Sequence, residues 1–126
     1  MEKIENILQR VEGSKAFNSL LKEHRKKSVT VHLENLVGGA LSLYSSALIA
    51  RAGGVHVFVA EDRDAAAYML NDFYALLDEE RVHFFPTSYK RSILYGKEDA
   101  QGVVQRTNAL NAIRHHKGGY LVICTY

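Results

Sequence analysis

The sequence predicts an α/β fold in which a parallel sheet is flanked by helices. Short apolar segments rich in β-branched residues alternate with segments whose apolar residues recur at helical spacing. The connections between the apolar segments are long enough for a crossover helix, which parallel strands require. With 126 residues, 47% of them hydrophobic and 24% charged, the chain has the size and composition of a folded globular domain.

The first part of the chain is predicted to be helical. The segment "MEKIENILQRVEG" carries four apolar side chains at helical spacing and ends at Gly13 as a stop: Ile4, Ile7, Leu8 and Val11. A second short helix follows, with three apolar side chains on one face: Phe17, Leu20 and Leu21. We therefore treat residues 1–28 as an N-terminal helical segment and residues 29–126 as the α/β region.

In the α/β region, strands and helices are expected to alternate. The expected strands are residues 29–33, 55–60, 82–85 and 120–125, and the expected helices are residues 41–51, 64–77 and 99–115. Asp62 or Asp64 is a candidate N-cap for the helix that follows. The segment "GYLVICTY" resembles a central strand with no loop or helix after it, so we expect the chain to be part of a longer protein.

The segment "LENLVGGALS" has the layout of a phosphate-binding loop without its chemistry. A working loop of the pattern G-x-x-x-x-G-K-[ST] needs backbone N–H groups, a lysine and a hydroxyl for Mg²⁺. Here Glu34 stands at the first glycine position, Ala40 at the lysine position and Leu41 at the hydroxyl position, after Gly38 and Gly39. The candidate site is thus a degenerate loop with residual anion affinity from the helix N-terminus, or a turn that only needs glycine's conformational freedom.

The remaining reactive residues give no catalytic pattern. Glu61, Asp62 and Asp64 follow a strand, as Mg²⁺-binding carboxylates do, but acidic residues also suit the first turn of a helix. The six histidines lack metal-ligand spacing, and Cys124 reads as a small core residue. We expect no catalytic residue, no metal site and no cofactor in this chain.

Charge and composition limit the classes of partner that can be expected. A net charge of +2 does not argue for nucleic acid or an anionic membrane, and no apolar run is long enough to cross a bilayer. The single cysteine suits a reducing, cytoplasmic location. Residues 86–98 are expected to form a loop whose interleaved basic and aromatic side chains are candidates for DNA or protein contact: Tyr89, Lys90, Arg91, Tyr95 and Lys97.

Four segments in order resemble the N-terminal, UvrB-like region of the bacterial transcription-repair coupling factors (Mfd). They are "LENLVGGALSLYSSALI", "VFVAEDRDAAAYMLNDFYALLDEERVHFFP", "DAQGVVQRTNALNAI" and "GYLVICTY", and together they span residues 33–126. The family's tryptophan-bearing segment after the third-strand proline is replaced here by "TSYKRSILYG", which puts any role of that loop in doubt.

The resemblance implies a partial RecA-like, P-loop-type lobe with a degenerate Walker A turn. The lobe would be a non-catalytic scaffold in a protein of transcription-coupled nucleotide excision repair. The full-length protein would be an ATP-dependent DNA translocase, with ATP and Mg²⁺ bound in downstream domains. It would displace stalled RNA polymerase and recruit UvrA, and this lobe would contact the rest of the same polypeptide. The alternative is a small nucleotide- or DNA-binding α/β domain with a non-standard phosphate loop.

Overall fold

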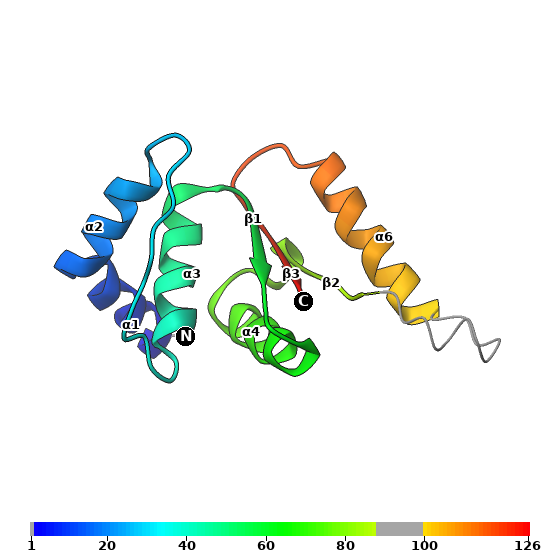
Figure 1. The fold of residues 1–126 in the computed structure, drawn as a ribbon, viewed down its shortest axis with the longest axis horizontal. Helices are drawn as coiled ribbons and strands as arrows, with labels where there is room; N and C mark the ends of the chain where they lie inside the picture. Colours follow the sequence, from blue (N-terminus) through cyan, green and yellow to red (C-terminus); the bar gives the residue numbers. More distant parts are fainter. Residues whose placement is uncertain (1, 88–99) are drawn as a thin grey trace. The chain divides into compact units, whose positions relative to one another are not determined.

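The computed structural model describes residues 2–87 and 100–126 and divides into two compact units, Met1–Gly53 and Gly54–Tyr126 (Figure 1). The first unit contains the helices α1 (Glu2–Glu12), α2 (Lys15–His24) and α3 (Ala40–Ala52). The second contains the strands β1 (Gly54–Val59), β2 (Val82–Phe85) and β3 (Tyr120–Thr125). Its helices are α4 (Arg63–Leu76), the short 3₁₀ turn η1 (Glu79–Arg81) and α6 (Ala100–Arg114). The boundary therefore follows α3, whereas the sequence-based division precedes the GGA turn.

The first unit is held together by apolar side chains from all three of its helices. Phe17 and Leu21 of α2 pack with Ala47 of α3, and partly buried residues of α1 and α3 surround them: Leu8, Val11, Tyr44 and Leu48. Ser14 begins α2, because its hydroxyl accepts a hydrogen bond from the Phe17 N–H at 3.2 Å. The apolar spacing of residues 2–24 thus predicted both α1 and α2.

The strand expected at residues 29–33 is wrong. Residues 29–37 have no regular secondary structure, and Val29, Val31 and Leu33 are all exposed. Positive φ angles occur at Ser28 (53°), directly before these residues, and at Asn35 (63°), among them. Alternating apolar residues favour a strand only when a neighbouring strand completes the ladder, and this segment pairs with none of the strands that the structure describes. The GGA turn is consequently not entered from a strand.

The second unit is built on a three-stranded parallel sheet with the order β1-β3-β2. Gly54 pairs with Tyr120 at one end of the sheet, and Phe85 pairs with Thr125 at the other. The central position expected for residues 120–125 is confirmed. The other three expected helices and the strands at residues 55–60 and 82–85 are also found, with ends shifted by at most one residue.

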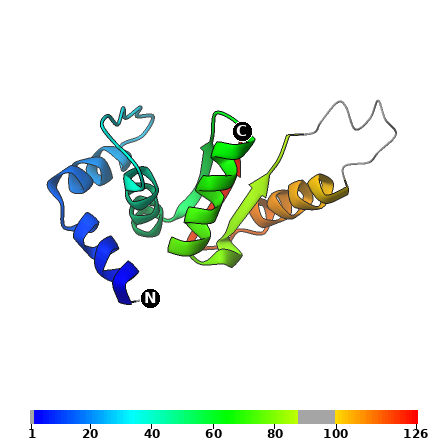
Figure 2. The same cartoon turned by 90° about the horizontal axis from the view of Figure 1, so that it is seen from below.

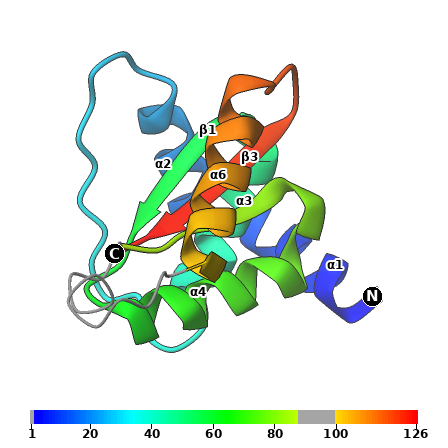
Figure 3. The same cartoon turned by 90° about the vertical axis from the view of Figure 1, so that its right-hand side faces the viewer.

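The two long helices of this unit cover opposite faces of the sheet. Phe58 of β1 meets Phe73 of α4 edge to face, with ring centroids 5.7 Å apart. Leu121 and Ile123 point to the other face, where they pack with Ala109 of α6. Figures 2 and 3 show α4 and α6 on the two sides of the strands. The chain crosses the sheet in one direction from β1 to β2 and in the opposite direction from β2 to β3. Because both crossovers are expected to be right-handed, their helices must lie on opposite faces of the sheet.

Candidate functional site

The GGA turn lies in the first unit, at the N-terminus of α3. Gly38 has a φ of 60°, and Gly39 is the N-cap residue of α3. The Ala40 N–H donates to the Val37 carbonyl at 3.2 Å, and the Leu43 N–H donates to the Gly39 carbonyl at 3.0 Å. A Cβ atom added at Gly38 or Gly39 would meet no atom within 4 Å, so the turn is open on the side of both glycines.

This geometry supplies a helix N-terminus but no cradle for a phosphate. A P-loop wraps around its ligand because a strand delivers the chain tightly against the helix, and here the preceding residues are exposed and irregular. Ala40 and Leu41 bring neither an ammonium group nor a hydroxyl. The nearby Glu34 is exposed and lies 3.6 Å from the imidazole of His32. Glycine is used here for the positive φ of Gly38, which an L side chain rarely adopts.

The carboxyl ends of the strands, where α/β folds place their ligands, are occupied by structural contacts. The Oδ1 of Asp62 accepts a hydrogen bond from the Ala65 N–H at 2.8 Å, so Asp62 is the N-cap of α4. Of the two candidates that the sequence offered for this cap, the structure selects Asp62. Asp64 lies in the first turn of the same helix. Of the three acidic residues considered for Mg²⁺, one is therefore committed to a helix cap.

Strand β3 is tied to both neighbours at this same end of the sheet. The Thr125 hydroxyl donates to the Phe85 carbonyl at 2.7 Å, and the Ala60 N–H donates to the Thr125 carbonyl at 2.8 Å. The rings of Phe84 and Tyr126 stack with centroids 6.1 Å apart. In the described ranges, no three side chains of His, Cys, Asp or Glu are close enough together to hold a metal ion.

Cys124 has the surroundings of a structural group, and two of the histidines can be compared with their expected places. Cys124 is fully buried in β3, and burial raises the pKa of its thiol to about 12. A thiol nucleophile needs the opposite shift. His32 was expected within a strand and instead lies in the exposed segment of residues 29–37, whereas His56 lies in β1 as expected.

The candidate contact loop falls outside the described residues. Tyr89, Lys90, Arg91, Tyr95 and Lys97 all belong to residues 88–99, so their role stays a prediction. The neighbouring Arg106 of α6 donates from Nη1 to the Pro86 carbonyl at 3.1 Å. Across the described part of the chain, every helix is too short or too polar to span a bilayer.

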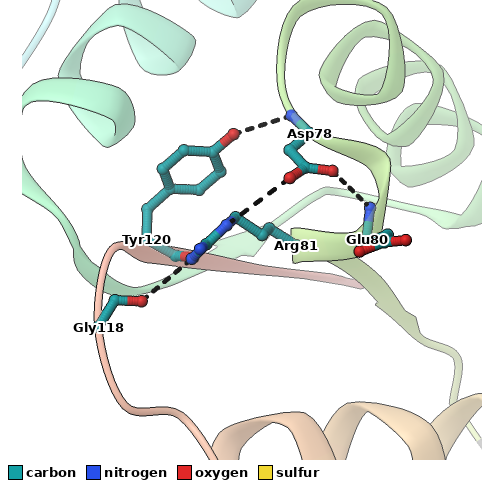
Figure 4. A network of polar contacts seen from close by, with 5 residues as sticks. All are labelled: Asp78, Glu80, Arg81, Gly118 and Tyr120. Carbon is teal, nitrogen blue, oxygen red and sulfur yellow. Dashed lines mark hydrogen bonds and ion pairs between the residues drawn. The ribbon is translucent and has the colours of Figure 1, made fainter.

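A polar cluster that sequence reasoning missed lies at the amino ends of β2 and β3 (Figure 4). The Nη1 of Arg81 donates to the carbonyls of Gly118 and Tyr120, at 3.0 Å each. The Tyr120 hydroxyl in turn accepts from the Asp78 N–H at 2.8 Å. The Arg81 guanidinium also lies 5.4 Å from the centroid of the Tyr120 ring.

This Arg81 cluster holds the turn that leads from α6 into β3. Gly119 has a φ of 70°, and a Cβ atom there would lie 2.6 Å from the Arg81 Nη1. The available signal in the sequence was the "KGGY" turn, but nothing in the sequence indicated which distant residue would fill the space beside it. The cluster lies at the amino ends of the strands, whereas α/β folds bind their ligands at the carboxyl ends, and we assign it a structural role.

Comparison with protein-family models, with curated proteins and with solved structures finds no match to this chain.

Proposed function

We propose that this chain is a non-catalytic α/β scaffold lobe. The observation that carries the proposal is the GGA turn: it keeps the helix N-terminus of a phosphate-binding loop but lacks the lysine, the hydroxyl and the strand that would form a cradle. The commitment of Asp62 to a helix cap and the burial of Cys124 support the same conclusion, because neither side chain is then available for catalysis.

The sequence resemblance extends this proposal to transcription-coupled repair. In that reading the chain is the UvrB-like lobe of a coupling factor, it contacts the rest of its own polypeptide, and ATP, UvrA, RNA polymerase and DNA are engaged elsewhere in the full-length protein. The coding frame beyond codon 126 tests this assignment. We expect it to continue through an intact G-x-G-K-[ST] loop and a D-E-x-[HQ] strand. A frame without these motifs contradicts the repair assignment and leaves the scaffold proposal standing.

The scaffold proposal predicts that nucleotide does not bind. MgATP below millimolar concentration is expected to leave the thermal unfolding midpoint unchanged, since a ligand that binds only the folded state must stabilise it. Differential scanning fluorimetry with and without MgATP measures this, and inorganic phosphate serves as a second probe of the turn. A rise in the midpoint at micromolar ATP would favour a nucleotide-binding domain instead.

A loop variant serves as the control for this measurement. Ala40→Lys combined with Leu41→Thr restores the two missing side chains on an exposed helix start. If the missing lysine and hydroxyl were the only reason why the turn does not bind nucleotide, MgATP would stabilise this variant. We expect no gain, because residues 29–37 form no strand against which a loop could close.

A further inference from the structure

The outer edge of β1 presents a regular set of backbone groups. The N–H groups of Gly54 and Ala60 donate to carbonyls of the segment containing β3, at 2.9 and 2.8 Å. Because alternate residues of a strand face opposite neighbours, the N–H and C=O groups of Val55, Val57 and Val59 point away from β3. Among residues 2–87 and 100–126, no strand pairs with this edge of β1.

The same three valines also expose their side chains. Val55 is 44% exposed, Val57 60% and Val59 69%. Their side chains lie on the α6 face of the sheet, where α6 packs mainly over β2 and β3. β1 carries no charged residue, proline or bulge, which are the devices that usually prevent strand edges from pairing. Within the second unit, this edge of β1 is thus apolar and unpaired by the described strands.

The alternation of the backbone groups restricts how two such edges can pair. Two copies related by a two-fold axis pair their β1 strands antiparallel, and the paired residues must be those whose N–H and C=O groups point outward. An axis at Val57 satisfies this condition with the greatest overlap: Val57 faces Val57 of the second copy, and Val55 faces Val59. All three valines then form cross-strand pairs on one face of a continuous sheet.

Charges at the two ends of the sheet favour the antiparallel arrangement. The exposed residues that follow the carboxyl end of β1 are net acidic, with Glu61, Asp62 and Asp64 against the single base Arg63. Exposed basic residues precede β3 at the amino end, namely Arg114 and Lys117. Glu79 and Glu80 also lie at the amino end, but they precede β2, which is two strand spacings or about 10 Å from the β1 edge. Antiparallel pairing brings the acidic end of each copy to the basic end of the other.

We propose that β1 is a self-association edge, through which a second copy of this chain adds its own β1 antiparallel about a two-fold axis at Val57. The dimer would contain one continuous sheet with the order β2-β3-β1-β1-β3-β2. This interface goes beyond the scaffold function and does not depend on it.

Substitution of Val57 tests the interface. Val57→Lys places two ammonium groups directly opposite each other at the axis, and we expect the dimer dissociation constant to rise at least about tenfold. The constant is measured by sedimentation velocity over a concentration series, with circular dichroism to confirm that the fold is kept. Val104→Lys on α6 is the matched control, because Val104 is 57% exposed and lies off the edge; its constant should equal that of the wild type.

Cross-linking tests the register. Val57→Cys is expected to form a disulfide-linked dimer under mild oxidation, since directly paired residues have Cα atoms about 5.5 Å apart. Val55→Cys alone should not cross-link, because its counterpart lies about 14 Å away in this register. A wild-type protein that stays monomeric at all concentrations, or equal cross-linking of the two cysteine variants, overturns the proposal.

Discussion

Cys124 illustrates how far a single residue can be interpreted from the sequence. A lone cysteine in an apolar strand predicted a small core residue, and the structure confirms this by burying it completely in the middle of the sheet. Burial disfavours the charged thiolate, so the pKa of the thiol rises to about 12. Burial disfavours the thiolate that a reactive cysteine needs, and the strand pattern had indicated that burial.

The raised pKa of Cys124 predicts a loss of stability in alkali. The folded state keeps the proton while the unfolded thiol loses it above its usual value of 9.0. The free energy of unfolding is therefore highest below that pH and should fall, by up to about 1.4 kcal/mol per pH unit, as the pH rises towards 12. Urea unfolding across this range measures the slope.

Cys124→Ala is the control for this titration. The variant removes the thiol and should lose much of the alkaline slope. Burial also raises the pKa of Tyr74, with Glu79 and Cys124 as further contributors, so a smaller slope of the same sign remains. An identical slope in the wild type and the variant would contradict the assignment to Cys124.

Among the elements, the turn before β3 depends most on one side chain far away in the sequence. Gly119→Ala would have to keep a φ of 70° and displace the Arg81 guanidinium, which lies where the Cβ atom must go. We expect the free energy of unfolding to fall by about 2–3 kcal/mol, from backbone strain and weakened hydrogen bonds. Chemical denaturation measures this loss.

Gly118→Ala provides the comparison within the same turn. A Cβ atom at Gly118 meets nothing within 4 Å, and its φ is not positive. This variant should change the stability by about 0.5 kcal/mol or less, as most surface substitutions do. Equal losses at Gly118 and Gly119 would show that the Arg81 cluster does not set the requirement for glycine.

Element type was predicted well wherever a segment's own pattern decides it. The helices α1, α2 and α4 follow their apolar spacing, and β1, β2 and β3 follow their β-branched and aromatic residues. Residues 29–33 and β1 show the limit of this approach, because both alternate apolar residues and only β1 is a strand. A strand requires a partner, and a local pattern does not name the partner.

At the scale of the whole molecule, the sequence predicted the fold class but not the strand order. Alternating strands and helices indicated a parallel sheet, and the buried pattern of residues 120–125 indicated its centre. The pairing of β3 with both β1 and β2 was not predictable in detail, because it depends on the packing of α4 and α6 on opposite faces. The candidate site was likewise only partly predictable: residues 38–41 were identified as a turn, but the expected strand before them is absent from residues 29–37.

The central place of β3 has a consequence for how the second unit forms. β1 and β2 touch β3 and not each other, yet both are synthesised before it. No strand pair of this sheet can exist until residues 120–125 have been made. Until then, Phe58 and Phe84 belong to segments of the growing chain that have no strand to pair with. Pairings that close such long loops form slowly. The sheet should therefore assemble in one late step, and the interval before it is when the nascent chain is most exposed to aggregation.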